Sequence, residues 1–214
     1  MIKAIIFDFD GVIVESAQVK TEAFRKLFSK WPNKVDEIVS YHIKNMGVSR
    51  YVKFKYFYEN ILKVPYSQEI SSELGRQFSD IVLDEIKKAP LVKGMKEFLN
   101  NDHKKYLLFI ASGTPQEELD DIIYFKGLSK YFISVFGTPA TKTEIVNNIL
   151  KEYNLEKDKV VFIGDAESDK RAAEETGIHF ILRVTPENIY LIDSNVPKIH
   201  DFIQLKDKIK EIEK

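Results

Sequence analysis

Five short segments that are apolar at nearly every position recur along the 214-residue chain, and all are rich in β-branched and aromatic residues. They cover residues 2–7, 106–111, 131–136, 160–163 and 180–184. Near-continuous apolar runs of this length are typical of strands covered on both faces. Helical periodicity separates the later segments, over residues 115–126, 143–153 and 167–176, and an amphipathic helix closes the chain. The alternation of strands and helices predicts an α/β fold with a parallel sheet.

Residues 15–92 break this alternation. They contain no clear strand and four helical patterns, over residues 16–30, 34–45, 49–62 and 68–87. Neighbouring parallel strands need a crossover of only a dozen or so residues, so a segment of this length indicates an inserted helical domain. We therefore expect a core formed by residues 1–14 and 93–214, and a helical domain formed by residues 15–92.

Composition narrows the classes of function. The charge is nearly balanced, with 32 basic and 33 acidic residues, which argues against a nucleic-acid or anionic-membrane partner. The chain has no cysteine, which fits a reducing compartment, and we find no signal peptide or membrane-length apolar run. We expect a cytoplasmic protein that is a monomer or a weak homodimer.

The first apolar segment ends in Asp8-Phe9-Asp10-Gly11. Residues i and i+2 of an extended segment face the same side, so Asp8 and Asp10 converge just past the strand. A solvated turn explains the motif equally well when it is taken alone. Two carboxylates this close raise the pKa of one of them unless a cation lies between them.

The second strand end continues into Ser112-Gly113-Thr114-Pro115. Thr114 followed by Glu117 predicts a capping box with proline at the first helical position. Ser112 and Gly113 would then lie in a strand-to-helix turn, where free N–H groups attract an anion. A plain loop is the alternative.

Thr141 followed by Glu144 predicts another capping box, which places Lys142 in the first helical turn. The helix macrodipole disfavours a cation there, by a few tenths of a kcal/mol up to about 1 kcal/mol. An anion beside Lys142 would offset this cost, whereas a surface lysine that points away is the alternative. We accordingly expect Lys142→Ala to leave thermal stability unchanged or slightly raised, and to reduce turnover strongly.

The fourth strand ends in Gly164-Asp165, and Asp169 follows four residues later. If a helical turn starts at residue 166, the two carboxylates share one side. An ordinary acidic residue at a helix start explains Asp169 but does not explain Asp165.

All four motifs follow the carboxyl ends of predicted strands, where open α/β sheets bind their ligands. Together they supply four carboxylates, one lysine and one hydroxyl. Carboxylate ligands that offer only oxygen atoms suit Mg²⁺, which keeps several waters and also binds a phosphate of the substrate. The sequence therefore predicts Mg²⁺-dependent chemistry on a phosphoryl group of a small phosphorylated substrate.

The set of motifs resembles the haloacid dehalogenase superfamily in order and spacing, with Asp8-Phe9-Asp10-Gly11-Val12 as its first motif and Ser112 as its second. Lys142 matches the third motif, and the segment from Gly164-Asp165 to Asp169 matches the fourth. The context of Lys142, Ala-Thr-Lys-Thr, departs from the commoner Lys-Pro. The resemblance implies a Rossmann-like core with a helical cap inserted after the first motif.

The resemblance also implies roles for individual residues. Asp8 would be the nucleophile that forms an aspartyl-phosphate, and Asp10 would protonate the leaving oxygen and then activate water. Mg²⁺ would bind the Asp8 carboxylate, the Asp10 main-chain carbonyl and Asp165, with Asp169 near the ion. Ser112, the Gly113 N–H and Lys142 would hold the phosphoryl oxygens.

The predicted function is a phosphatase for a small phosphorylated metabolite. A phosphomutase of the β-phosphoglucomutase type is the alternative, because the first motif resembles that branch at Val12, and a non-catalytic binding subunit is a third possibility. In the cap, Gly47 would let a loop reach the core, and Arg50 and Lys53 would meet an acidic substrate. Alternatively the aromatic residues around them form the cap core and these two cations are solvated.

Overall fold

Six parallel strands form one sheet in the computed structural model, which describes residues 1–192 and 195–213. The strands are β1 (Ala4–Phe7), β2 (Leu107–Pro115), β3 (Ser134–Thr138), β4 (Val160–Gly164), β5 (His179–Arg183) and β6 (Lys198–Ile199). Their order across the sheet is β3-β2-β1-β4-β5-β6, so β1 lies between β2 and β4. The predicted parallel α/β fold is confirmed.

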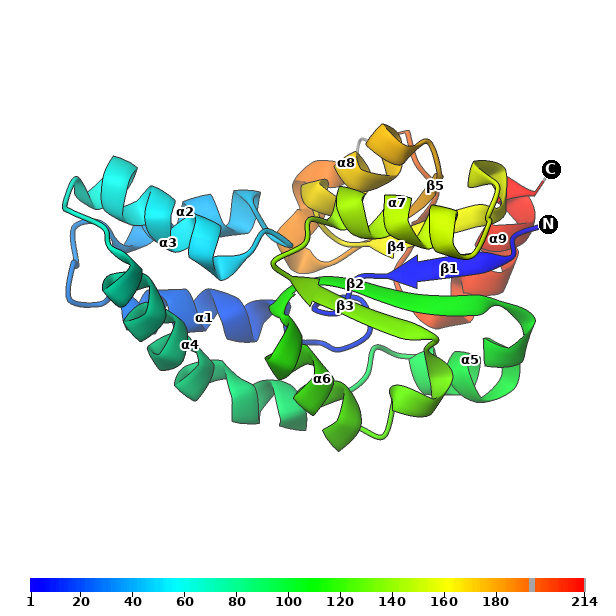
Figure 1. Ribbon diagram of the computed structural model, residues 1–214, viewed down its shortest axis with the longest axis horizontal. Helices are drawn as coiled ribbons and strands as arrows, with labels where there is room; N and C mark the ends of the chain where they lie inside the picture. The colour runs from blue at the N-terminus through cyan, green and yellow to red at the C-terminus, as the bar shows by residue number, and fades with distance from the viewer. Residues whose placement is uncertain (193–194, 214) are drawn as a thin grey trace.

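Helices cover both faces of this sheet (Figure 1). They are α5 (Met95–Asp102), α6 (Gln116–Phe125), α7 (Lys142–Glu152), α8 (Glu167–Thr176) and α9 (Leu205–Ile212). Alternate side chains of β1 enter two separate apolar clusters. Ile5 and Phe7 belong to the cluster that contains residues of α5, α6 and α9, whereas Ile6 packs with residues of α7 and α8. Because apolar clusters cover both faces of the sheet, the central strands are apolar at nearly every position.

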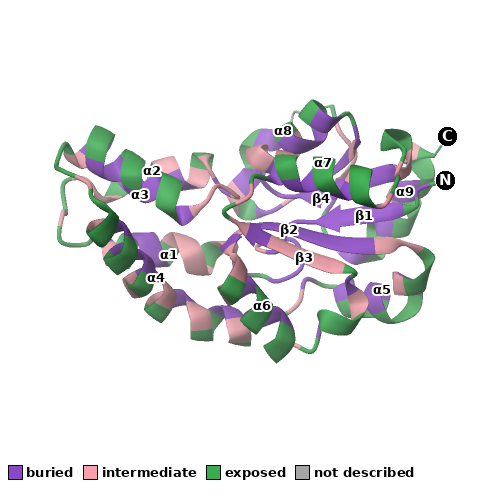
Figure 2. Cartoon of the chain, viewed as in Figure 1, coloured by how far each residue is buried: buried purple, intermediate pink, exposed green. Residues whose placement is uncertain are grey.

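All regular elements between β1 and α5 are helices, and they extend away from the sheet (Figure 1). It contains α1 (Ala17–Leu27), α2 (Val35–Lys44), α3 (Arg50–Tyr56), a six-residue π-helix (Phe57–Leu62) and α4 (Gln68–Lys88). Its interior is aromatic, since Phe24, Phe28, Phe54 and Phe57 are at most 1% exposed. Figure 2 shows the buried positions of these helices facing one another and the exposed positions facing outwards. We call residues 15–92 the helical insert.

The two connections between the insert and the sheet lie side by side. The Glu15 N–H donates to the Pro90 carbonyl at 3.0 Å, and the Val92 N–H donates to the Ile13 carbonyl at 3.0 Å. The chain therefore leaves and returns to the sheet at one place, next to the carboxyl end of β1.

Several element boundaries differ from those predicted. β3 begins at Ser134 rather than at residue 131, because residues 129–131 form a 3₁₀ turn. β2 continues to Pro115, beyond the predicted end at residue 111, and its pairing with β3 is irregular over this extension. The short elements α5 and β6 were not predicted. No helix in the described part of the chain is both long and apolar enough to cross a membrane.

Candidate active site

The sheet order brings three of the predicted motifs to one place. Asp8 follows β1, and its N–H donates to the carbonyl of Ile163 in β4 at 3.0 Å. Ser112 lies in β2 on one side of β1, and Asp165 follows β4 on the other side. The three residues therefore meet at the carboxyl edge of the sheet, where ligands of open α/β sheets bind.

Three carboxylates from this edge form a compact group. Asp8, Asp165 and Asp169 each place one carboxylate oxygen within 4.8 Å of the others. Asp8 and Asp165 are 2% exposed and Asp169 is fully buried. Buried carboxylates at this spacing repel one another unless a cation neutralises them, so the group is a candidate metal site.

Lys142 supplies a cation to the same group. Thr141 and Glu144 form the predicted capping box, and α7 begins at Lys142. The Lys142 ammonium lies 2.9 Å from the Asp8 carboxylate and also donates to the Asp169 carboxylate. The side chain is 6% exposed, so the alternative of a surface lysine is wrong.

Asp169 and Asp165 differ in how their carboxylates are used. One oxygen of Asp169 accepts from the Asp165 N–H at 3.1 Å and from the Ala166 N–H at 3.0 Å, and the other accepts from Lys142. The carboxylate of Asp165 accepts no hydrogen bond from any described residue. The Asp169 carboxylate therefore caps the first turn of α8. The Asp165 carboxylate oxygens are available to bind a ligand.

Burial dominates the electrostatics of the group. It raises the pKa of Asp8 to about 7, and the neighbouring Asp169 and Asp10 charges act in the same direction while Lys142 opposes them. Burial and the charges of Asp8 and Asp169 also raise the pKa of Asp165 well above its usual range. Burial disfavours the Lys142 ammonium, but Asp169 and Asp8 outweigh this effect and raise its pKa.

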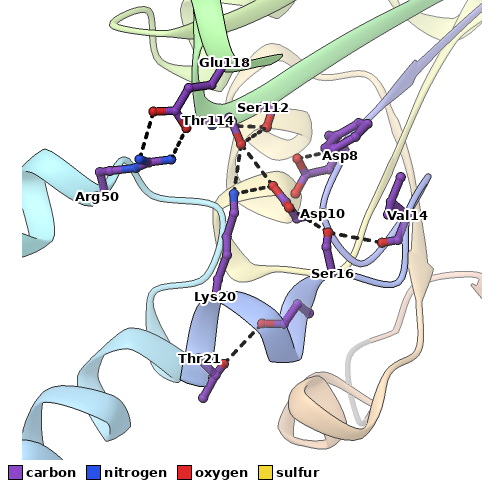
Figure 3. Close-up of polar contacts among 12 residues, drawn as sticks. Asp8, Asp10, Val14, Ser16, Lys20, Thr21, Arg50, Ser112, Thr114 and Glu118 are labelled. Carbon is purple, nitrogen blue, oxygen red and sulfur yellow. Dashed lines mark hydrogen bonds and ion pairs between the residues drawn. The ribbon is translucent and has the colours of Figure 1, made fainter. Parts of the chain in front are cut away.

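Asp10 takes part in a separate polar network beside this group (Figure 3). Its carboxylate accepts from the Ser16 hydroxyl at 2.7 Å, from the Thr114 hydroxyl at 3.1 Å and from the Lys20 ammonium. Burial alone would raise the pKa of Asp10, but the Lys20 charge and these hydrogen bonds lower it. Asp10 is therefore held as a carboxylate.

The predicted capping box at Thr114 is wrong. The residue before α6 is Pro115, which has no capping side chain, and the Thr114 hydroxyl accepts from Lys20 at 2.8 Å while it donates to Asp10. The Ser112 hydroxyl donates to Thr114 at 3.2 Å, so the end of β2 is tied to Asp10 instead of to a helix.

Glycines allow the insert to approach the sheet edge closely. Gly47 has φ +74°, and a β-carbon there would lie 2.9 Å from the Lys142 ammonium nitrogen. A β-carbon on Gly113 would lie 2.4 Å from the Gly47 carbonyl oxygen. The prediction that Gly47 lets a loop of the insert reach the core is confirmed.

Arg50 and Lys53 are buried, so the alternative that they are solvated is wrong. They are 5% and 3% exposed, and both line a pocket together with Asp8, Asp10 and Asp165. The same alternative placed the neighbouring aromatic residues in the core of the insert. Phe54, Phe57 and Tyr58 are buried there, as expected, but Tyr51 is 38% exposed. The insert therefore forms the roof of a pocket whose floor carries the carboxylates.

A family model described as haloacid dehalogenase-like hydrolase matches residues 5–183. The chain belongs to this family. A phosphorylated carbohydrates phosphatase from Thermotoga maritima is 30% identical over 192 residues, which cover 85% of each chain. The family and this relative support a phosphatase enzyme.

Solved structures share the fold over nearly the whole chain. A predicted phosphatase from Clostridium acetobutylicum has a TM-score of 0.76 at 19% identity and covers 99% of both chains. A β-phosphoglucomutase from Clostridium difficile also has a TM-score of 0.76, at 20% identity, covering 99% of this chain and 97% of that one. At these identities the likeness shows the fold alone.

Sequence reasoning missed Lys20 and Ser16, which hold the Asp10 carboxylate of this hydrolase. Both lie at the start of the first predicted helix, four residues apart, and side chains at this spacing share one helix face. The available signal was this pair of polar residues, which begins the first helix after the Asp8-Phe9-Asp10 motif. The role of Thr114 had no such signal, because the capping-box pattern fits its sequence equally well.

Proposed function

We propose that this hydrolase is a Mg²⁺-dependent phosphatase of a small phosphorylated metabolite, with Asp8 as the nucleophile. One observation carries the proposal: three buried carboxylates, from residues 8, 165 and 169, gather at the carboxyl edge of the sheet, and the Lys142 ammonium pairs with two of them, Asp8 and Asp169. The phosphorylated carbohydrates phosphatase from Thermotoga maritima supports a sugar phosphate or similar ester as substrate.

The residues present fit a magnesium ion. Burial and mutual repulsion disfavour the charged forms of Asp8 and Asp165, and a divalent cation beside them would reverse this effect. Asp8 and Asp165 would hold the ion, which when bound neutralises charge on the phosphoryl oxygens. Asp169 would support it by orienting Lys142 and the backbone at residues 165 and 166.

In the first step, a carboxylate oxygen of Asp8 attacks phosphorus while the bond from phosphorus to the ester oxygen breaks. The leaving oxygen takes a proton from Asp10, and Asp8 becomes an aspartyl-phosphate. Lys142 and the donors around Ser112 and Gly113 stabilise the transferring phosphoryl group. Asp10 is ionised in the structure, and the negative charge of a bound phosphate ester raises the pKa of a neighbouring carboxyl group toward the protonated form.

In the second step, water attacks the phosphorus of the aspartyl-phosphate and gives its proton to the Asp10 carboxylate. The bond between phosphorus and the Asp8 oxygen breaks, which releases inorganic phosphate and restores the Asp8 carboxylate. Hydrogen bonds from Ser16, Lys20 and Thr114 would hold the Asp10 side chain in position during both steps (Figure 3). We further propose that the helical insert acts as a cap that excludes bulk water during these steps.

The test is the Asp8→Asn variant with p-nitrophenyl phosphate and radiolabelled acetyl phosphate. We expect turnover to fall by several orders of magnitude and acid-stable label on the protein to disappear, because an amide is a poor nucleophile. Asp158→Asn is the matched control, since Asp158 is exposed. Label on well-folded Asp8→Asn protein would exclude Asp8 as the nucleophile.

Analysis of the reaction products distinguishes a phosphatase from the alternative, a phosphomutase. A phosphatase releases inorganic phosphate without an activator, whereas a mutase depends on a sugar bisphosphate and conserves the phosphoryl group on a sugar.

A further inference from the structure

Three cations of the helical insert line the pocket above the carboxylates, and two of them already have a carboxylate partner. Lys20 pairs with Asp10. The Arg50 guanidinium donates to both carboxylate oxygens of Glu118, at 3.0 and 2.6 Å. It also donates to Ser79 at 2.9 Å, so most of its donors are occupied. Figure 3 shows the pair that it forms with Glu118.

Lys53 is the exception. Its side chain is 3% exposed, and no carboxylate of the described residues, 1–192 and 195–213, lies within 4.0 Å of its ammonium. Its hydrogen-bond partner is Nδ1 of His42, at 3.0 Å, and the ring of Phe24 lies 5.6 Å away. A buried ammonium without a counterion is costly, and a chain retains one where something else supplies the negative charge.

His42 fixes the position of Lys53. The Thr21 hydroxyl donates to the Ala17 carbonyl at 3.3 Å, so its oxygen accepts from Nε2–H of His42, 3.2 Å away. The Nδ1 lone pair of a neutral imidazole then accepts from Lys53. Burial, together with the charges of Lys53 and Lys20, lowers the pKa of His42 well below its usual value, which keeps the ring neutral.

We propose that Lys53, positioned by His42, binds a second anionic group on the substrate, a carboxylate or a second phosphate, remote from the phosphoryl group that reacts at Asp8. The assignment of the reacting phosphoryl group to Asp8 rests on the proposed phosphatase function. Apolar side chains of Phe24, Met46 and Phe78 line the same pocket and would contact the carbon skeleton between the two anions.

The electrostatics of the roof agree with this assignment. Burial and the neighbouring charges of Lys20, Lys142 and Arg50 lower the pKa of Lys53 well below its usual value, and only Asp10 opposes them. The charged form of Lys53 is therefore disfavoured before substrate enters. An anion beside Lys53 restores the balance and favours its charged form.

The experiment compares phosphate esters that differ only in the second anion. Glycerol 3-phosphate is paired with 3-phosphoglycerate, and fructose 6-phosphate is paired with fructose 1,6-bisphosphate. For each pair, kcat/KM of the doubly anionic ester is divided by that of the singly anionic one. We expect this ratio to exceed one for at least one pair in the wild-type protein, and the pair identifies the second anion as carboxylate or phosphate.

Lys53→Met and Lys53→Gln retain most of the side-chain volume and remove the charge. We expect either variant to lower that ratio about tenfold or more, mainly through KM, as is typical when a buried charged partner is removed. Lys53→Arg should restore part of it. Lys55→Met is the matched control and should leave the ratio unchanged, because Lys55 lies on the same helix with its side chain 63% exposed.

Two results would overturn the proposal: ratios of one or less for both pairs in the wild-type protein, or equal losses on both members of a pair in the Lys53 variants. If none of the four esters is hydrolysed, thermal shifts with the same four probes decide the subsite independently of the proposed phosphatase function. Stabilisation by a doubly anionic probe that the Lys53 variants lose would retain the subsite, whereas stabilisation unaffected by Lys53 would exclude it.

Discussion

Lys142 occupies the first position of α7, where the macrodipole disfavours a cation, yet its ammonium lies between two buried carboxylates. The dipole costs at most about 1 kcal/mol, whereas breaking a buried ion pair costs roughly 3–5 kcal/mol. The sequence-based expectation that Lys142→Ala preserves stability considered only the smaller of these effects. The structure reverses it.

We now expect Lys142→Ala to lower the free energy of unfolding by roughly 3 kcal/mol, because Asp8 and Asp169 lose their shared cation. Turnover should fall about a hundredfold or more, the scale of a lost oxyanion donor. Urea unfolding and steady-state kinetics measure the two effects. Lys151→Ala serves as the control, since Lys151 is exposed on the same helix; an Lys142 variant as stable as this control would contradict the buried ion pairs.

Asp165 and Asp169 should separate metal binding from folding. Asp165→Asn should abolish most of the rise in melting temperature on adding Mg²⁺, because its carboxylate has no other partner among the described residues. Asp169→Ala should lower the melting temperature without metal, because two backbone N–H groups and Lys142 lose their acceptor. Calorimetric titration with Mg²⁺ gives the affinities, and a larger loss of affinity in Asp169→Ala than in Asp165→Asn would reverse the assignment.

At the scale of single elements, α3 shows where sequence reasoning was incomplete. One of the two interpretations of the sequence placed its aromatic residues in the core of the insert and left the cations between them exposed. The buried positions are instead Arg50, Lys53, Phe54 and Phe57, which recur at intervals of three and four, whereas Tyr51 is 38% exposed. The periodicity was present in the sequence, but the usual assignment of Arg and Lys to the solvated face concealed it.

The pair between Arg50 in α3 and Glu118 in α6 connects the insert to the core, and its partners are 4% and 19% exposed. A double-mutant cycle with Arg50→Met and Glu118→Gln should give a coupling free energy of about 1–3 kcal/mol. Lys87 and Asp121 form the control pair between α4 and α6, with 18% and 51% exposed, and their coupling should stay below about 1 kcal/mol. Equal coupling in the two cycles would contradict the larger contribution expected of the buried pair.

At the scale of the whole molecule, the sequence predicted which strand ends meet at the candidate site but not which strands are neighbours. Apolar runs identify strands because both faces of the sheet are covered, and the missing strands of residues 15–92 identify the insert. Strand order depends on contacts between distant segments, so the placement of β1 between β2 and β4 appears only in the structure. β6 was missed because its two residues form a strand only through their pairing with β5.

That arrangement brings the buried carboxyl groups of Asp8, Asp165 and Asp169 together, so the stability of the fold should depend on pH and on Mg²⁺. Burial and like charges raise the pKa of Asp8 from 3.8 to about 7 and also raise that of Asp165. The folded protein therefore binds protons more tightly than the unfolded chain between about pH 4 and pH 7, and this contribution to stability is lost as pH rises through that window.

Mg²⁺ takes the place of these protons, so the increase in melting temperature on adding Mg²⁺ should be larger at pH 8 than at pH 5. Thermal unfolding at both pH values with Mg²⁺ or with chelator measures the difference, which cancels contributions from acids outside the site. Asp165→Asn should nearly remove it, and an equal or larger Mg²⁺ effect at pH 5 would show that the carboxylates of residues 8 and 165 do not bind the ion.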